Sequence, residues 1–232
     1  MKQTVIRYAC FIAGLLLLGI GVDMIVTSAL GTTPISSVNY VLSLNLPLTL
    51  GTATFVFNLV IIALQFWLIR GGVGTKKDRI EILLQIPFSV LFSLFIDLNM
   101  LWVSKIPTPN YGVQVALLLG GCIVQATGVV LELKPNVAIM SAEGMVKYLC
   151  KRYHLNFGKT KIKFDVTLVV TAVILSLIMA RKIDGVREGT LVAALLTGVL
   201  VNWIAAHIAT RRNVRRIKKI YHYPLHFFGL KK

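Results

Sequence analysis

Residues 29–40, A-L-G-T-T-P-I-S-S-V-N-Y, decide how this chain folds. They lie in an uncharged window, because no Asp, Glu, Lys or Arg occurs between Asp23 and Arg70. Gly31 and Pro34 nevertheless interrupt the stretch, which makes it a poor membrane-spanning helix. Lipid cannot satisfy the N–H and C=O groups of a broken backbone, so such a segment must be buried in protein or line a watery cavity. We therefore predict a half-helix that begins at Pro34, a residue suited to a first helical turn, and dips into the membrane; the alternative is a short amphipathic surface helix.

The composition around this stretch is that of a polytopic membrane protein. Of the 232 residues, 56% are hydrophobic and 15% are charged, against about 45–50% and about 25% in soluble domains. Several apolar runs have the roughly 20 residues needed to cross a bilayer. We expect the first run to be retained as a helix rather than cleaved as a signal peptide. The expected spans are 6–28, 52–70, 80–104, 112–133, 164–181 and 189–210.

The basic residues predict the orientation of these spans. Of the 25 Lys and Arg residues, 21 fall in the N-terminus, the second and fourth loops and the tail, and four fall on the opposite side. This bias places both termini in the cytoplasm of a cell with a plasma (inner) membrane. The net charge of +16 therefore follows membrane topology, and we expect no nucleic-acid partner. The basic tail, residues 211–232, suits the anionic lipids of the bilayer surface.

The chain resembles itself at a shift of 107 residues. Gly14 then corresponds to Gly121, and Asn58 corresponds to Asp165. Each copy has a glycine-bearing span, a broken segment and two further spans. Because three crossings reverse the orientation of the second copy, we predict an all-α fold with six transmembrane helices in two inverted three-helix repeats. The predicted parts are a first repeat, 1–110, a second repeat, 111–210, and a basic tail, 211–232.

The second copy has its own broken segment, 134–148, K-P-N-V-A-I-M-S-A-E-G-M-V-K-Y, which again begins with a proline, Pro135. Paired interrupted segments in an inverted repeat are the best pointer to a transporter's binding site. Their N-termini carry partial positive charge and free N–H groups, which suit an anion or a carboxylate. In the alternative, both segments simply cap the bundle, one on each face.

Acidic residues inside or at the ends of the spans are further candidates. A carboxylate at a helix centre costs roughly 2.5–3.5 kcal/mol on insertion scales, so such groups usually face a cavity or a partner. Asp23, Asp97, Glu132 and Asp165 have this position. Asp165 also follows three lysines closely, and a local ion pair explains it as well as a binding role does. Asn58, which corresponds to Asp165 in the first copy, is expected to face the same centre between the two repeats.

Three other polar features have both a simple and a functional explanation. Gln85 lies near a kink expected at Pro87 in the third span. Glu143 and Lys147 have the spacing of a favourable helical pair, or Glu143 is a gating or proton-coupling acid. Glu188 suits a helix N-terminus, or binds a ligand together with its neighbour Arg187.

Catalytic patterns are missing from the sequence. There is no H-E-x-x-H, no G-x-S-x-G and no phosphate-binding glycine loop. The three cysteines lack a C-x-x-C spacing, and the four histidines form no metal set. We therefore expect no enzyme, no metal and no cofactor.

Five motifs carry a family resemblance: G-T-T-P-I-S-S-V-N-Y, L-G-T-A-T-F-V-F-N-L, L-L-Q-I-P, F-G-K-T-K-I-K-F-D-V and G-V-R-E-G-T-L-V-A-A-L-L-T-G. In this order they resemble bacterial YczE/YyaS/YitT-type integral membrane proteins over nearly the whole chain, up to about residue 205. The resemblance implies a bacterial inner-membrane protein, often regarded as a transporter, and implies no substrate. The basic tail departs from the shared pattern. By match, the resemblance points to Gly31, Pro34, Ser36, Ser37, Asn58, Gln85, Asp97, Glu143, Asp165 and Glu188.

The leading hypothesis is a transporter or permease that binds a small solute between the two repeats. One alternative is a passive channel, since channels also join inverted three-helix halves by two half-helices. Another is a non-transporting membrane partner of an enzyme or signalling protein, docked through the basic tail. Assembly as a homo-oligomer stays open. The candidate substrate-binding residues are Gly31, Pro34, Ser36, Ser37, Asn58, Gln85, Glu143, Gly144, Asp165 and Glu188.

Overall fold

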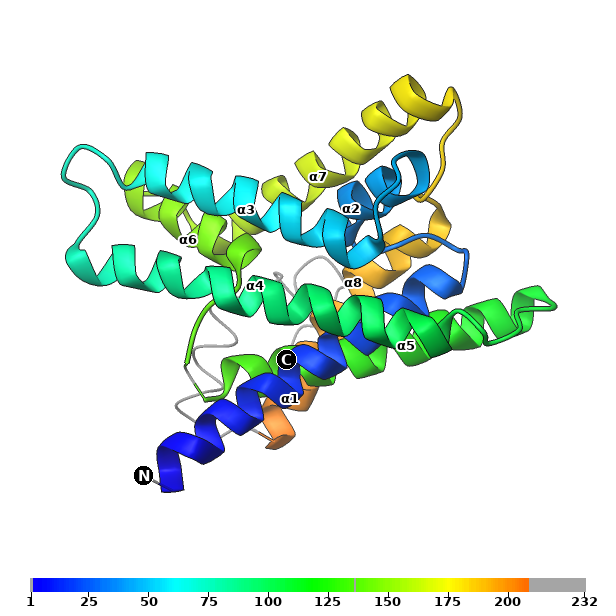
Figure 1. The fold of residues 1–232 in the computed structure, drawn as a ribbon, viewed down its shortest axis with the longest axis horizontal. Helices are drawn as coiled ribbons and strands as arrows, with labels where there is room; N and C mark the ends of the chain where they lie inside the picture. The colour runs from blue at the N-terminus through cyan, green and yellow to red at the C-terminus, as the bar shows by residue number, and fades with distance from the viewer. Residues whose placement is uncertain (1, 136, 209–232) are drawn as a thin grey trace, which may run out of the picture.

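The computed structural model describes residues 2–135 and 137–208, and this part of the chain is all-helical (Figure 1). The predicted polytopic membrane fold is thereby confirmed. The described helices are α1 (Lys2–Thr27), α2 (Pro34–Asn45), α3 (Leu50–Leu68), α4 (Lys76–Val103), α5 (Tyr111–Leu133), α6 (Ser141–Tyr153), α7 (Phe157–Ala180) and α8 (Glu188–Ile208).

Six of these helices, α1, α3, α4, α5, α7 and α8, are long and apolar enough to cross a membrane. They match the predicted spans closely, except that α7 begins at Phe157 rather than at 164. Asn156 caps α7 by accepting a hydrogen bond from the Lys159 N–H, so the basic stretch before Asp165 is already helical. The short helices α2 and α6 have 12 and 13 residues, or about 18 and about 20 Å, well under a hydrocarbon core of roughly 30 Å.

A short helix follows the break at residues 29–40, as predicted. This helix, α2, begins at Pro34, and the N-cap residue Thr33 accepts a hydrogen bond from the Ser36 N–H. Gly31 has a φ of +129°, a conformation that favours glycine. The expectation of a proline-led start is wrong for the second segment, because α6 begins at Ser141 and Pro135 lies in the link before it.

The two halves pack in corresponding ways. The α1–α4 contact in the first half matches an α5–α8 contact in the second. Each short helix packs mainly in the opposite half, α2 against α7 and α6 against α3. The N-terminus and the α3–α4 link lie at the left end of Figure 1, and the α4–α5 and α7–α8 links lie at the right end. The division at residue 110 itself stays a prediction.

Glycines allow α1 and α5 to pack closely along the centre of the molecule. A Cβ added at Gly21 would lie 2.6 Å from the backbone nitrogen of Gln125, and one at Gly128 would lie 2.6 Å from that of Leu18. Small residues let membrane helices approach through their backbones, which increases van der Waals contact where no hydrophobic force drives association. The α1–α5 pair therefore forms a close central contact between the halves.

One pairing is unequal between the halves. Helix α3 packs along α4, whereas α7 and α8 make no comparable contact among the described residues. Figure 1 shows α7 diverging from α8 towards the upper right.

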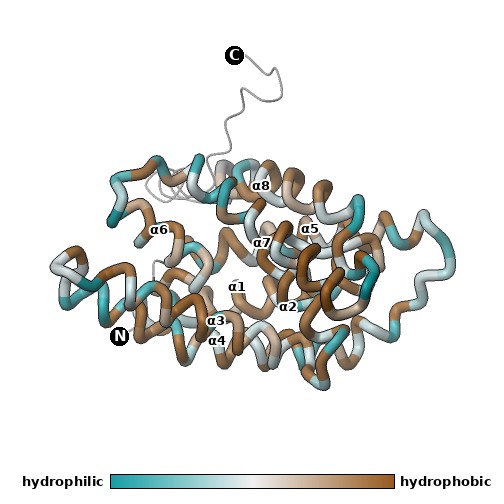
Figure 2. The backbone as a smooth tube through the Cα atoms, turned by 90° about the horizontal axis from the view of Figure 1, so that it is seen from above, coloured by the Kyte–Doolittle hydropathy of each residue, from teal (hydrophilic) through white to brown (hydrophobic). Residues whose placement is uncertain are grey.

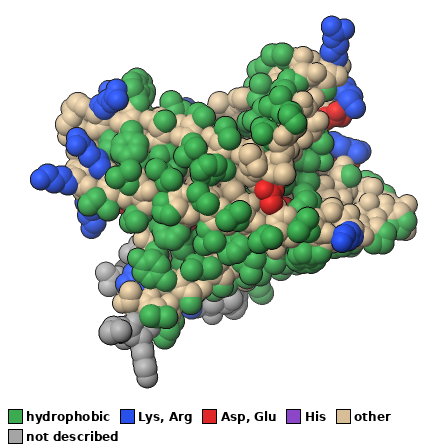
Figure 3. All heavy atoms as spheres, in the orientation of Figure 1, with side chains coloured by type: hydrophobic (Ala, Val, Ile, Leu, Met, Phe, Trp, Pro, Cys, Tyr) green, Lys and Arg blue, Asp and Glu red, His purple; other side chains and the backbone are tan. Residues whose placement is uncertain are grey.

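The surface is that of a membrane protein. Large hydrophobic side chains are exposed along the long helices, among them Leu98, Leu101 and Ile178. Figure 2 shows apolar residues along the helices and polar residues concentrated in the links. In Figure 3, Lys and Arg side chains gather towards the two ends of the view, and hydrophobic side chains cover the face between them. This distribution is expected of a protein whose middle contacts lipid.

Candidate functional site

The first turns of α2 and α6 line a cavity between the two halves. The space that the centre of a water molecule can reach there is about 120 Å³. Since one water needs roughly 10–15 Å³ on this measure, the cavity has room for a small molecule. All eight helices contribute to its wall. The polar lining residues are Thr33, Ser36, Asn39, Thr54, Asn58, Gln125, Glu132, Ser141, Glu143, Lys161, Asp165 and Thr197.

At the α2 end of the cavity, the protein caps its own helix. Thr33 Oγ1 accepts a hydrogen bond from the Ser36 N–H, and the Thr33 hydroxyl donates to Ser36 Oγ at 3.1 Å. The Ser37 hydroxyl donates to the carbonyl of Pro34 at 2.7 Å and lies outside the lining. The sequence predicted free N–H groups at the start of this half-helix. One of them, that of Ser36, already has Thr33 as its hydrogen-bond acceptor.

At the α6 end, the cap comes from another helix. The N-cap residue Met140 provides no side-chain hydrogen bond. Instead, the backbone of Met140 hydrogen-bonds to the carboxylate of Glu132, which projects from α5 and is 4% exposed. Ser141, the first residue of α6, donates its hydroxyl to Asn58 Oδ1 at 2.5 Å.

A buried ion pair lines the same cavity. Lys161 Nζ lies 2.7 Å from Asp165 Oδ1, one helical turn along α7. The two side chains are 6% and 11% exposed. The predicted local ion pair of Asp165 is therefore confirmed, and the pair also contributes to the cavity wall.

Half of the predicted binding residues line the cavity. These are Pro34, Ser36, Asn58, Glu143 and Asp165. The other five, Gly31, Ser37, Gln85, Gly144 and Glu188, lie elsewhere. Their roles in binding stay predictions.

The remaining polar lining residues were not among these ten, although Glu132 had been noted as an acid within its span. On α5, Gln125 and Glu132 are seven residues apart, with Val129 between them on the same helical face. That spacing identifies a common face. Asn39 lies one turn after Ser36 on α2, so the same reasoning places it beside the cavity.

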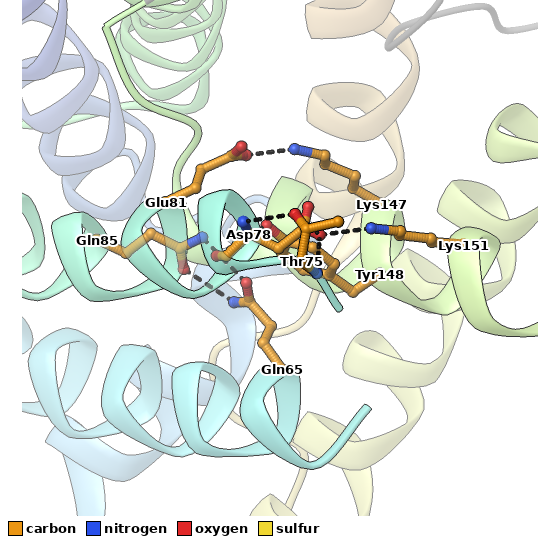
Figure 4. Close-up of polar contacts among 8 residues, drawn as sticks. All are labelled: Gln65, Thr75, Asp78, Glu81, Gln85, Lys147, Tyr148 and Lys151. Atoms are coloured by element: carbon orange, nitrogen blue, oxygen red, sulfur yellow. Dashed lines mark hydrogen bonds and ion pairs between the residues drawn. The ribbon is translucent and has the colours of Figure 1, made fainter. Parts of the chain in front are cut away.

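A group of polar residues closes one end of the molecule. We call it the α4–α6 cluster (Figure 4): Gln65, Thr75, Asp78, Glu81, Gln85, Lys147, Tyr148 and Lys151. Gln65 and Gln85 exchange two amide hydrogen bonds, at 2.9 and 3.0 Å, and Gln65 also donates to the Ser141 carbonyl at 3.0 Å. Gly144 packs against this amide pair, because a Cβ there would lie 2.7 Å from both side chains.

Ion pairs complete the α4–α6 cluster. Lys147 pairs with Glu81 of α4, so the expected helical pair between Lys147 and Glu143 is wrong. Lys151 pairs with Asp78, which also forms a capping box with Thr75 at the start of α4. The short helix α6 is thus fastened to the α3–α4 hairpin by charge and by hydrogen bonds.

At the opposite end, the α1–α2 link is fastened to the start of α8. The Gly189 N–H donates to the Leu30 carbonyl at 2.8 Å, and the Thr32 N–H donates to Thr190 Oγ1 at 3.1 Å. Gly31 lies against Thr190, which leaves no room for a side chain. Glu188 is half exposed and pairs with Arg187, outside the cavity. The cavity therefore lies between two fastened ends.

Two acids near the ends of their spans lie outside the cavity. Asp97 accepts hydrogen bonds from the Gly51 N–H and the Thr49 hydroxyl, both at 2.8 Å, and so caps α3. Asp23 is fully buried on α1, and neither of its carboxylate oxygens has a hydrogen-bond partner among the described residues. Within residues 2–135 and 137–208, no group of three His, Cys, Asp or Glu side chains is placed to hold a metal ion.

Comparison with known proteins gives one match. The model of a family of unknown function, DUF6198, matches residues 5–206. No curated protein and no solved structure matches the chain. The resemblance to YczE/YyaS/YitT-type proteins stays a prediction.

Proposed function

Because the chain belongs to the DUF6198 family, whose function is unknown, we propose its function from the site: it is a membrane transporter that moves a small solute through the central cavity. One observation carries this proposal. Two helices too short to span the membrane, one from each half, begin at the same cavity, and buried polar side chains surround their first turns. Interrupted segments that meet between repeats are where transporters bind their substrates.

The two fastened ends support a transport cycle. The α4–α6 cluster holds one end closed, and the contact of residues 30–32 with Gly189 and Thr190 holds the other. Release of one end at a time would expose the cavity alternately to the two sides, while the α1–α5 contact stays in place. Two ion pairs at partly exposed positions hold only weakly, so the α4–α6 end is suited to reversible opening.

The cellular setting belongs to the same proposal. We place the protein in a bacterial inner membrane with both termini in the cytoplasm, which puts the α4–α6 cluster on the cytoplasmic side. The basic tail, residues 211–232, lies outside the described residues, and its contact with anionic lipid is likewise proposed. No enzymatic role is proposed.

Cysteine accessibility tests the proposal without knowledge of the solute. In a chain whose Cys10, Cys122 and Cys150 are replaced by serine, Thr54→Cys places a thiol in the cavity wall. Ser89→Cys is the matched control, since Ser89 is fully buried and lies outside the lining. A small membrane-impermeant thiol reagent is then applied to right-side-out and to inverted vesicles.

A cross-link distinguishes the possible functions. Glu81→Cys and Lys147→Cys, joined by a short bifunctional reagent, lock α6 to α4. A transporter should then lose Thr54→Cys labelling from the α6 side and gain it from the other side, because the locked protein populates the oppositely open state. If the cross-link leaves Thr54→Cys labelling from the side opposite α6 unchanged, the result would indicate a channel. No labelling from either side, before or after locking, would overturn the proposal.

A further inference from the structure

The carboxyl group of Glu132 joins the cavity wall to the start of α6. Glu132 projects from α5, lines the cavity and is 4% exposed. The backbone of Met140, the N-cap residue of α6, hydrogen-bonds to this carboxyl group. Because the two partners belong to different helices, a movement of α6 relative to α5 breaks the contact and changes the surroundings of the acid.

The two short helices differ in the chemistry at their N-termini. At the start of α2, the hydroxyl of Thr33 accepts a hydrogen bond from the Ser36 N–H, and a hydroxyl stays neutral at physiological pH. At the start of α6, the side chain is a carboxyl group, which can gain or lose a proton. Helix α6 is also the helix that the α4–α6 cluster fastens to α4 (Figure 4). The fastened end of the molecule therefore has an acid at its inner edge.

The observed arrangement suits a carboxyl group that carries a proton. Oε1 of Glu132 is buried and has no hydrogen-bond partner among the described residues. An ionised carboxylate needs hydrogen bonds and a counter-charge to replace its water, and a buried acid without them takes up a proton instead. The contact with Met140 survives protonation, because a neutral carboxyl group still has acceptor capacity.

The helices around Glu132 provide several other ionisable groups. Among the described side chains these are Arg7 and Cys10 on α1, Lys134 after α5, Glu143 on α6, and Lys161 and Asp165 on α7. Arg7 donates to the carbonyl of Pro135 at 2.8 Å. Lys161, the lysine of the cavity wall, pairs with Asp165 at 2.7 Å. None of these groups is a hydrogen-bond partner of Oε1.

Opening of the α6 end changes the state of the acid. In the proposed cycle, release of the α4–α6 cluster lets α6 move and connects the cavity to the water on that side. Hydration then replaces the missing hydrogen bonds of Glu132. A hydrated glutamate is ionised at neutral pH, so the acid gives up its proton to that water.

From these observations we propose that Glu132 is a proton-binding site linked to the α6 end: it holds a proton while this end is closed and releases it when the end opens. The O–H bond breaks, the electron pair stays on the carboxylate, and the proton passes to water. This inference rests on the proposed transport function and names the proton as an ion that the same site binds and releases.

The pH dependence of cysteine labelling tests the link. Because opening releases a proton, a rise in pH favours the open α6 end. The rate of Thr54→Cys labelling from the α6 side should rise about tenfold per pH unit near neutral pH, since one proton is linked to opening. The pH dependence of thiol reactivity itself is removed by division by the rate for Lys77→Cys, an exposed position at the start of α4. A corrected rate that does not change with pH would overturn the proposal.

Three variants assign the response to Glu132. Glu132→Gln resembles the protonated acid at every pH, so its labelling from the α6 side should stay at the low-pH rate. Glu132→Asp should keep a pH response, because it retains a carboxyl group. Asp23→Asn is the matched control, since Asp23 is fully buried but does not line the cavity, and the response should survive there. An unchanged response in Glu132→Gln would overturn the assignment.

Infrared spectroscopy tests the proton itself, without any need for transport. The purified full-length protein is locked by the cross-link between Glu81→Cys and Lys147→Cys, and the C=O stretching band of protonated carboxylic acids is recorded at neutral pH. Glu132→Gln should remove a component of this band, and Glu132→Asp should shift it. A band that neither change alters would overturn the proton site, whereas the response of Thr54→Cys labelling to the lock still decides the transport proposal.

Discussion

The amide pair of Gln65 and Gln85 gives a sharp prediction about stability. Both side chains are buried, at 0% and 1% exposure, and they share two hydrogen bonds. A third bond joins Gln65 to the Ser141 carbonyl. Gln65→Leu removes three bonds and leaves the Gln85 amide without a partner. Gln85→Leu removes two and leaves Gln65 bound to Ser141.

The number of bonds sets the expected magnitude. Hydrogen bonds between membrane helices average about 0.6 kcal/mol in double-mutant cycles, so Gln65→Leu should cost about 2 kcal/mol and Gln85→Leu about 1 kcal/mol. The double variant should lose less than Gln65→Leu alone, because replacing both partners by apolar groups is often nearly neutral. The two substitutions are therefore expected to be strongly non-additive.

The free energy of unfolding is measured for the full-length protein in mixed detergent micelles by titration with a denaturing detergent, with far-ultraviolet circular dichroism as the readout. Additive losses, near 3 kcal/mol for the double variant on the same per-bond value, would refute the proposed pairing.

Two further predictions concern the centre of the molecule. Gly21→Ala should lower the unfolding free energy by about 1–3 kcal/mol in the same titration, because its methyl group meets the Gln125 backbone; Gly112→Ala, whose nearest neighbour is 3.4 Å away, is the control and should change little. Asp165→Asn should cost about 3–5 kcal/mol by removing the carboxylate that pairs with the buried Lys161 ammonium. The double change Lys161→Met and Asp165→Leu should recover much of that loss, and a double variant as unstable as Asp165→Asn would contradict this account.

The sequence was sufficient for features that depend on neighbouring residues. The long helices follow from apolar runs, whose length is a property of the chain alone. The start of α2 follows from Thr33 and Pro34, and the Asp165 pair follows from the one-turn spacing to Lys161. In each case the interacting groups are close in sequence, so their contact is fixed once the helix forms.

Other features depend on how helices meet, which sequence spacing does not reveal. Lys147 has Glu143 one turn away, yet α4 brings Glu81 nearer, and the interhelical ion pair forms. Pro135 suggested a helix start, but α6 begins only at Ser141. The Glu132 carboxyl group of α5 hydrogen-bonds to the backbone of Met140 just before this start. The cavity itself is assembled from all eight helices, so no local pattern identifies its complete wall.

The unequal packing of the two hairpins has a consequence for the shape of the other state. In one half α3 lies along α4, and in the other α7 stands away from α8, although both hairpins occupy equivalent places in the chain. Under the proposed repeat, each half displays a geometry that its counterpart can adopt. An exchange of the two geometries would bring α7 onto α8 and part α3 from α4. Under the proposed transport cycle, the first half is a template for the second, and the two halves together display both ends of the motion.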